Sequence, residues 1–131
     1  DYWSHWISFD KKTNKLPKIF HINWFRKDNE GKFLWPGFNE NLRVLRWIID
    51  RCDEKINARE TAIGFLPHAC DIDTSDLDIA QQNIDELLSI DENDWIEEIN
   101  SIGKYILSFG ERVPIELINE YNKLSKSLDN N

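Results

Sequence analysis

The stretch NWFRKDNEGKFLWPGFNEN, residues 23–41, contains five aromatic side chains around a turn and a Pro-Gly break. DNEG, residues 28–31, has the composition of a tight turn, because its glycine can adopt positive φ. We therefore predict a β-hairpin that pairs residues 18–25 with residues 32–35. The break at residues 36–37 ends the pairing, because proline has no backbone N–H to donate.

The segments before the turn predict a helix followed by a strand. Residues 2–9 place aromatic and aliphatic side chains at spacings of three and four, which is typical of one face of a helix. Residues 18–25 alternate in the manner of a strand. One face of this strand would carry Ile19, His21 and Asn23, and the other Phe20, Ile22 and Trp24.

The segments after the break predict a second helix and a third strand. Asn39 or Asn41 can cap a helix that ends near Asp53. Its apolar side would consist of Leu42, Leu45, Ile49 and Cys52. TAIGFLP, residues 61–67, is bounded by turn residues and predicts a strand or an extended segment packed on the hairpin.

The last part of the chain predicts three helices, of which the last two are separated by Gly110 and Pro114. Their apolar stripes are Ile84, Leu87 and Leu88; Trp95, Ile99, Ile102 and Ile106; and Leu117, Tyr121, Leu124 and Leu128. The predicted fold class is α+β: a short antiparallel sheet, made of the hairpin and a third strand, with flanking helices and a carboxy-terminal helical segment. We expect residues 1–131 to form one unit of a larger chain. Within it, residues 1–67 form an aromatic sheet and helix region, and residues 68–131 an acidic helical segment.

Charge divides the chain into two unlike halves. Residues 1–60 contain 12 Lys and Arg against 9 Asp and Glu, a balance of +3, whereas residues 61–131 contain 4 against 15, a balance of −11. The net charge of −8 argues against nucleic acid as a partner, because an acidic surface repels phosphate backbones. No apolar run is long enough to span a membrane, so we expect a cytoplasmic protein.

The first residue and the cysteines lead to two further expectations. The chain begins with Asp1 and contains no methionine, which predicts a piece of a longer polypeptide. Cys52 and Cys70 are not spaced as a CxxC pair, and we expect two buried thiols rather than a disulfide or a zinc site.

The aromatic residues of the 23–41 stretch allow two interpretations. Clustered aromatic side chains usually pack in a core, here the core of the hairpin. Alternatively, rings at the edge of a loop form a slot for a flat partner such as a purine, because base stacking is worth ~1–3 kcal/mol per base. An amide such as Asn41, which both donates and accepts, could read the edge of guanine or adenine.

Longer motifs resemble the GTP-dependent phosphoenolpyruvate carboxykinases over nearly the whole chain. They are the HW helix at residues 5–6, LPKIFHINWFRKD, GKFLWPGF followed by EN and RVLRWI, ETAIGFLP, and the closing acidic helices. The resemblance implies an enzyme of gluconeogenesis that converts oxaloacetate and GTP into phosphoenolpyruvate, CO₂ and GDP. It covers roughly the last fifth of the family's length.

The resemblance also implies which residues contact the nucleotide. Phe25, Phe33 and Phe38 match the aromatic pocket around the guanine ring, with Trp24 supporting it. Asn41 matches the position that hydrogen-bonds the base, and the nucleotide-contacting loop comprises Phe38, Asn39, Glu40 and Asn41. The family usually has glycine where this chain has Asn39 and a small residue where it has Leu42.

The resemblance places the catalytic parts of the enzyme upstream of this chain. The sequence contains no Gly-x-x-x-x-Gly-Lys-Ser/Thr motif to cradle phosphates. The resemblance implies that the phosphate loop, the manganese and magnesium ligands, the oxaloacetate-binding arginines and the lid lie upstream of this chain. We expect no catalytic residue and no metal ligand here, an inactive fragment, and a monomeric parent enzyme.

Other constellations favour structural roles. Asp71, Asp73, Ser75 and Asp76 imitate the start of a calcium loop, but the later glycine and glutamate positions are not matched, so we expect caps and a solvated turn. Arg43 follows the aromatic loop and is a further nucleotide-site candidate. The alternative function is a stand-alone purine- or protein-binding module without catalysis.

Overall fold

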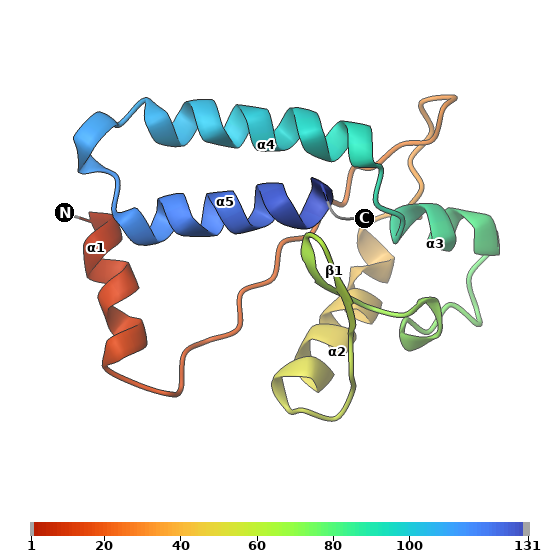
Figure 1. Cartoon of the computed structure of the whole chain (residues 1–131). Helices are drawn as coiled ribbons and strands as arrows, with labels where there is room; N and C mark the ends of the chain where they lie inside the picture. The colour runs from red at the N-terminus through yellow and green to blue at the C-terminus, as the bar shows by residue number, and fades with distance from the viewer. Residues whose placement is uncertain (1, 130–131) are drawn as a thin grey trace. The chain divides into compact units, whose positions relative to one another are not determined.

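The computed structural model describes residues 2–129 and confirms the α+β class (Figure 1). Contacts group the chain into two compact units. The aromatic unit comprises residues 18–89, and the helical unit comprises residues 1–17 together with 90–131.

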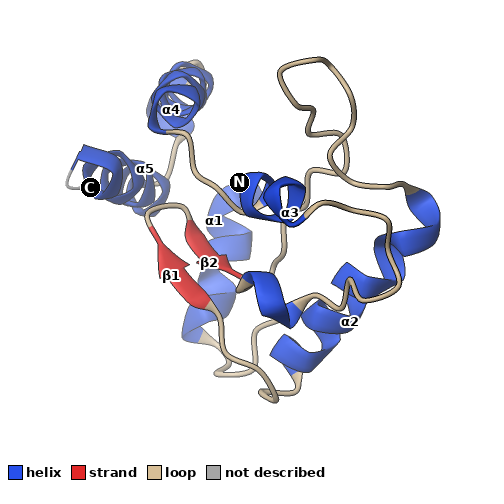
Figure 2. Cartoon of the chain, turned by 90° about the vertical axis from the view of Figure 1, so that its right-hand side faces the viewer, coloured by secondary structure: helices blue, strands red, loops and turns tan. Residues whose placement is uncertain are grey.

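The aromatic unit surrounds a small core of Trp35, Ile72 and Ile84, against which Trp24 and Val44 pack. Its regular elements are η2 (Phe38–Glu40), α2 (Asn41–Cys52), β1 (Arg59–Thr61), β2 (Gly64–Leu66), η3 (Ala69–Asp71) and α3 (Gln81–Leu87). The strands β1 and β2 pair in antiparallel fashion (red in Figure 2).

The predicted sheet is displaced along the sequence. Residues 18–25 and 32–35 do not form strands, and only a bridge between Lys27 and Phe33 remains of the predicted hairpin. The 61–67 segment, expected as a strand or an extended segment packed on the hairpin, contributes to a separate hairpin through β1 and β2. The physical reason is that side chains along residues 20–24 are alternately half-buried and exposed although no strand pairs with this segment. The alternation therefore reflects side-chain packing and not strand pairing.

Helix α2 differs from its prediction at its start and on its surface. Neither Asn39 nor Asn41 caps it: Glu40 occupies the N-cap position without a side-chain bond, and Asn41 is already helical. The helix buries Trp47, whereas the predicted apolar side of Leu42, Leu45, Ile49 and Cys52 is exposed. Helix α2 carries apolar residues on more than one side, so the spacing of its apolar residues could not predict which side is buried.

Both cysteines are exposed free thiols, so the prediction of buried thiols is wrong. Cys52 is the last residue of α2, and Cys70 lies in the single turn of η3. Each position is at the end of an element or in a short turn, where a side chain remains open to water.

The predicted carboxy-terminal helices are confirmed. In the helical unit, α4 (Glu92–Leu107) and α5 (Ile115–Asp129) pack side by side, and η4 (Gly110–Arg112) lies between them in sequence (Figure 1). Gly103 of α4 is buried against Tyr121 of α5, so closely that a Cβ at this position would lie 2.5 Å from the tyrosine hydroxyl oxygen.

The amino-terminal helix is also confirmed, as α1 (Tyr2–Ile7) followed by η1 (Ser8–Lys11). Trp3 packs edge-on against Phe109 with ring centroids 4.6 Å apart, which fixes α1 within the helical unit. None of the helices within residues 2–129 combines the length and the apolar character that crossing a membrane requires.

Candidate functional site

The turn in the aromatic stretch is held by the carboxylate of Asp28. Its Oδ1 accepts hydrogen bonds from the backbone N–H groups of Glu30 and Lys32, each at 2.9 Å. Gly31 has φ of 80°, as its turn position predicts, because a side chain would strain this conformation. The result is a tight loop (orange in Figure 1) whose arms are fixed by local bonds and not by a sheet.

Three phenylalanines point outward from this loop and its continuation. Phe25 is 73% exposed, Phe33 50% and Phe38 87%. The rings of Phe25 and Phe33 meet edge to face with centroids 6.2 Å apart, and the Lys27 ammonium lies 5.0 Å from the Phe33 centroid. Lys27 thus lies over the Phe33 ring, whereas Phe25 and Phe38 remain mostly exposed and open to a flat partner.

The two tryptophans of the stretch have the opposite role. Trp35 is 6% exposed and belongs to the core of the aromatic unit, and Trp24 packs against it with ring centroids 6.4 Å apart. The two interpretations of the aromatic cluster therefore apply to different residues: the tryptophans form the core, and the phenylalanines are left at the surface.

Arg26 anchors the loop to the end of α3. Its guanidinium donates to the carbonyl oxygens of Leu87 and Ser89, at 3.3 and 3.0 Å, and to the Ser89 hydroxyl at 3.1 Å. The sequence analysis did not single out Arg26. The signal available in the sequence was its position between Phe25 and the turn. A half-buried arginine at such a position needs several acceptors, and Leu87 and Ser89 provide them.

The segment with residues 38–41 reverses direction at Gly37, where φ is 126°. It forms the short helix η2, in which Phe38 and Asn39 are exposed and Glu40 is half-buried. Gly37 provides the unusual backbone angle, so the asparagine at position 39 needs no left-handed conformation.

Arg43 braces this segment from within the protein. Its Nε donates to the Glu40 carboxylate and its Nη1 to the Asp73 carbonyl oxygen, both at 2.7 Å. The bond to Glu40, with the negative charges of Glu40, Asp73 and Asp76, raises the pKa of Arg43 above its ordinary value. Arg43 thus uses its donors to hold Glu40 and the 73–76 loop, and the Glu40 carboxylate is engaged as well.

Asn41 begins α2 and contacts the core through its side chain. Its Oδ1 accepts a hydrogen bond of 2.9 Å from the indole Nε1–H of Trp35. Among the predicted site residues, the structure thus links Phe25 to Phe33 by ring contact and connects Asn41 to the core.

Other features of the described residues have simpler roles. Asp71 accepts from the His68 backbone N–H, and Asp73 accepts from the backbone and hydroxyl of Ser75, which confirms the predicted caps and turn. Within residues 2–129, no three His, Cys, Asp or Glu side chains gather in a way that could hold a metal ion.

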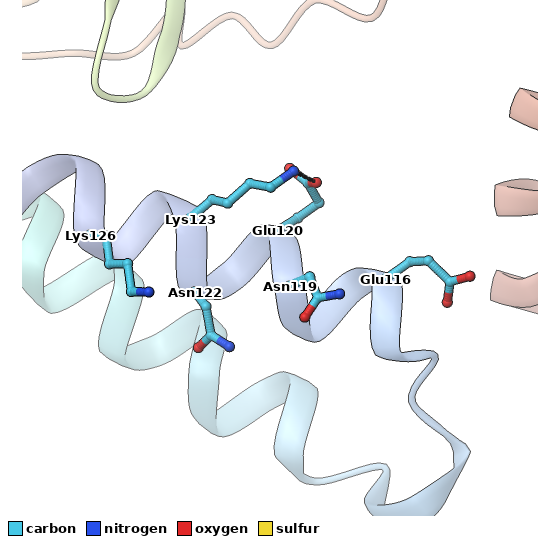
Figure 3. Close-up of a pocket in the computed structure, with 6 residues that line it drawn as sticks. All are labelled: Glu116, Asn119, Glu120, Asn122, Lys123 and Lys126. Carbon is cyan, nitrogen blue, oxygen red and sulfur yellow. Dashed lines mark hydrogen bonds and ion pairs between the residues drawn. The ribbon is translucent and has the colours of Figure 1, made fainter.

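A shallow pocket lies on the helical unit. One helix, α5, supplies all of its lining residues, and Figure 3 shows their side chains spread along that helix. They are Glu116, Asn119, Glu120, Asn122, Lys123 and Lys126, and all of them are exposed. Such a surface has no buried polar group to orient a ligand.

Comparison with known proteins connects these features to one family. The family model described as phosphoenolpyruvate carboxykinase C-terminal P-loop domain matches residues 1–127. The chain is 44% identical over 128 residues to phosphoenolpyruvate carboxykinase [GTP] of Chlamydia trachomatis, covering 97% of this chain and 21% of that protein. It is 46% identical over 131 residues to the protein of the same name from Neocallimastix frontalis, covering 98% of this chain and 21% of the relative. The chain therefore spans about a fifth of the length of these curated relatives.

Proposed function

Because this chain belongs to the phosphoenolpyruvate carboxykinase C-terminal P-loop domain family, we propose that it forms the guanine-binding part of a GTP-dependent phosphoenolpyruvate carboxykinase. The complete enzyme would convert oxaloacetate and GTP into phosphoenolpyruvate, CO₂ and GDP. From the family resemblance we also propose a monomeric cytoplasmic enzyme of gluconeogenesis. The chain by itself would bind and position the nucleotide without catalysing the reaction.

The observation that carries this proposal is the outward orientation of Phe25, Phe33 and Phe38. Large apolar side chains normally gain ~1.5–3 kcal/mol from burial, so a group of exposed rings on an anchored loop calls for a ligand or a partner. A purine suits them because stacking rewards flat apolar faces. Trp24 would support the pocket from the core, while Asn39 and Glu40 would shape its loop, Glu40 through its pairing with Arg43.

The proposed contribution to catalysis is positional. Loss of CO₂ from oxaloacetate would leave the enolate of pyruvate, and the γ-phosphoryl group of GTP would be transferred to the enolate oxygen. Binding the base at a distance from the reacting atoms assists this step, because it fixes the orientation of the phosphates. Manganese and magnesium would neutralise phosphate charge in the complete enzyme, and none of the residues proposed here holds them.

The test is an activity assay of the complete enzyme of which this chain would be a part. Phosphoenolpyruvate formation from oxaloacetate would be measured with GTP and with ATP, in the presence of manganese. We expect GTP to support the reaction with the larger kcat/KM. Equal use of ATP would contradict guanine recognition, and a chain that binds purine nucleotides without any carboxykinase activity would favour the stand-alone binding module.

A further inference from the structure

Trp35 makes a polar contact that ties the core of the aromatic unit to a predicted base-reading residue. Its indole is 6% exposed, and its Nε1–H lies 2.9 Å from Oδ1 of Asn41. The reversal at Gly37 and the short helix η2 bring these two residues together although they are six positions apart in the sequence.

This hydrogen bond determines which way the Asn41 amide points. An asparagine amide has an oxygen that accepts and an amino group that donates, and the two can exchange places by a flip. An indole N–H can only donate, so it requires the oxygen on its side. The amino group Nδ2 therefore points away from Trp35, and no acceptor for it is found among residues 2–129.

The two purines present opposite groups to such an amide. Guanine carries the acceptor O6 at the position where adenine carries the donor N6–H₂. A fixed Nδ2–H₂ donor at Asn41 can bond to O6 but meets a second donor in adenine. If Asn41 could flip freely, its oxygen could accept from N6–H₂ and the discrimination would be reduced.

We propose that Trp35 is a positioning residue that sets the guanine preference by locking the Asn41 amide with its amino group toward the base. This inference rests on the proposed function, because it assumes that Asn41 meets the base. It adds a determinant of specificity that does not itself contact the nucleotide. The same hydrogen bond gives the buried indole N–H a partner that it would otherwise lack, so one contact serves both the core and the site.

The chain provides a matched control in Trp47. It is also 6% exposed and also belongs to the aromatic unit, but its Nε1 has no hydrogen-bond partner among the described residues. Trp35→Phe and Trp47→Phe remove the same atoms from a buried position. Only Trp35→Phe removes a hydrogen bond to Asn41.

The experiment compares kcat/KM for GTP with kcat/KM for ATP in the complete enzyme and in each variant. We expect Trp35→Phe to lower the GTP-over-ATP ratio by about 10-fold, the loss of roughly one base-reading contact. Trp47→Phe should leave this ratio unchanged, because a purely structural defect lowers activity with both nucleotides alike. In an Asn41→Ala background, Trp35→Phe should have no additional effect on the ratio.

Two different failures can be told apart. If the unaltered enzyme does not prefer GTP, the proposed function is wrong. If it prefers GTP but Trp35→Phe leaves the ratio unchanged, or changes it as much as Trp47→Phe does, the positioning role of Trp35 is wrong. Should Trp35→Phe fail to fold, the Asn41→Asp variant provides the second measurement. Its side chain can only accept when ionised, so it should also lose the preference for GTP; retention of that preference would overturn the inference.

Discussion

Truncation of Phe38 is expected to weaken nucleotide binding with little effect on stability. The side chain is 87% exposed, so Phe38→Ala removes few contacts and is expected to change the free energy of unfolding by less than about 0.5 kcal/mol. If the ring stacks on guanine, its loss costs ~1–3 kcal/mol of binding free energy. At about 1.4 kcal/mol per tenfold change, KM for GTP should rise by about 5- to 160-fold.

The assay is steady-state phosphoenolpyruvate formation by the complete enzyme at varied GTP. Stacking on the base holds GTP in the ground state as well as in the transition state, so KM should rise, and the looser orientation of the phosphates should also lower kcat. Phe65→Ala is the matched control, because Phe65 in β2 is also an exposed phenylalanine, 62% accessible, outside the loop. An unchanged KM in Phe38→Ala, or an equal rise in Phe65→Ala, would refute the stacking role.

Three further predictions concern packing and charge. Gly103→Ala should lower the free energy of unfolding by about 1 kcal/mol, because overpacking against α5 outweighs the better helix propensity of alanine; the exposed Ser101→Ala is the control, and stabilisation of the Gly103 variant would contradict the close approach. Lys55→Met should raise the pKa of Asp53 toward its ordinary value, because the hydrogen bond and charge of Lys55 now lower it. A carboxyl group whose pKa is lowered in the folded state stabilises the fold at pH values above its unfolded-state pKa, and this stabilisation is lost as the pH falls through its folded-state pKa. The Lys55→Met variant should therefore lose this part of the dependence of stability on acid pH. An unchanged Asp53 midpoint in a carboxyl NMR titration would contradict the prediction. Arg26→Ala should destabilise the chain by about 1 kcal/mol in urea unfolding, because two carbonyl groups and a hydroxyl lose their donor, and an unaltered midpoint would show that Arg26 does not anchor the loop.

Periodicity identified the helices of this chain but not its sheet. The stripe through Trp95 and Ile99 predicted α4, since a long run at helical spacing has few alternative structures. Alternation over residues 18–25 was a weaker guide, because an extended segment buries every second side chain whether or not a strand lies beside it. The strands β1 and β2 are only three residues each, too short for alternation to reveal both of them.

The site was predictable as a stretch of sequence but not as a set of contacts. The turn residues and the clustered rings located the loop, and the positive φ of Gly31 followed from its turn position. Which rings point outward depends on Trp35 packing against Ile72 and Ile84, residues distant in sequence. The hydrogen bond between Trp35 and Asn41 depends on the reversal at Gly37, which local spacing does not reveal.

The central claim is that the loop around the turn binds a guanine base, and photo-crosslinking of the complete enzyme with 8-azido-GTP tests it most directly. Digestion with trypsin would release residues 19–26 and 33–43, which contain the three outward phenylalanines. The proposal predicts that the label attaches to one or both of these peptides, and that GTP prevents the labelling at concentrations where ATP does not. Labelling confined to other peptides, or labelling that ATP and GTP suppress equally, would contradict it.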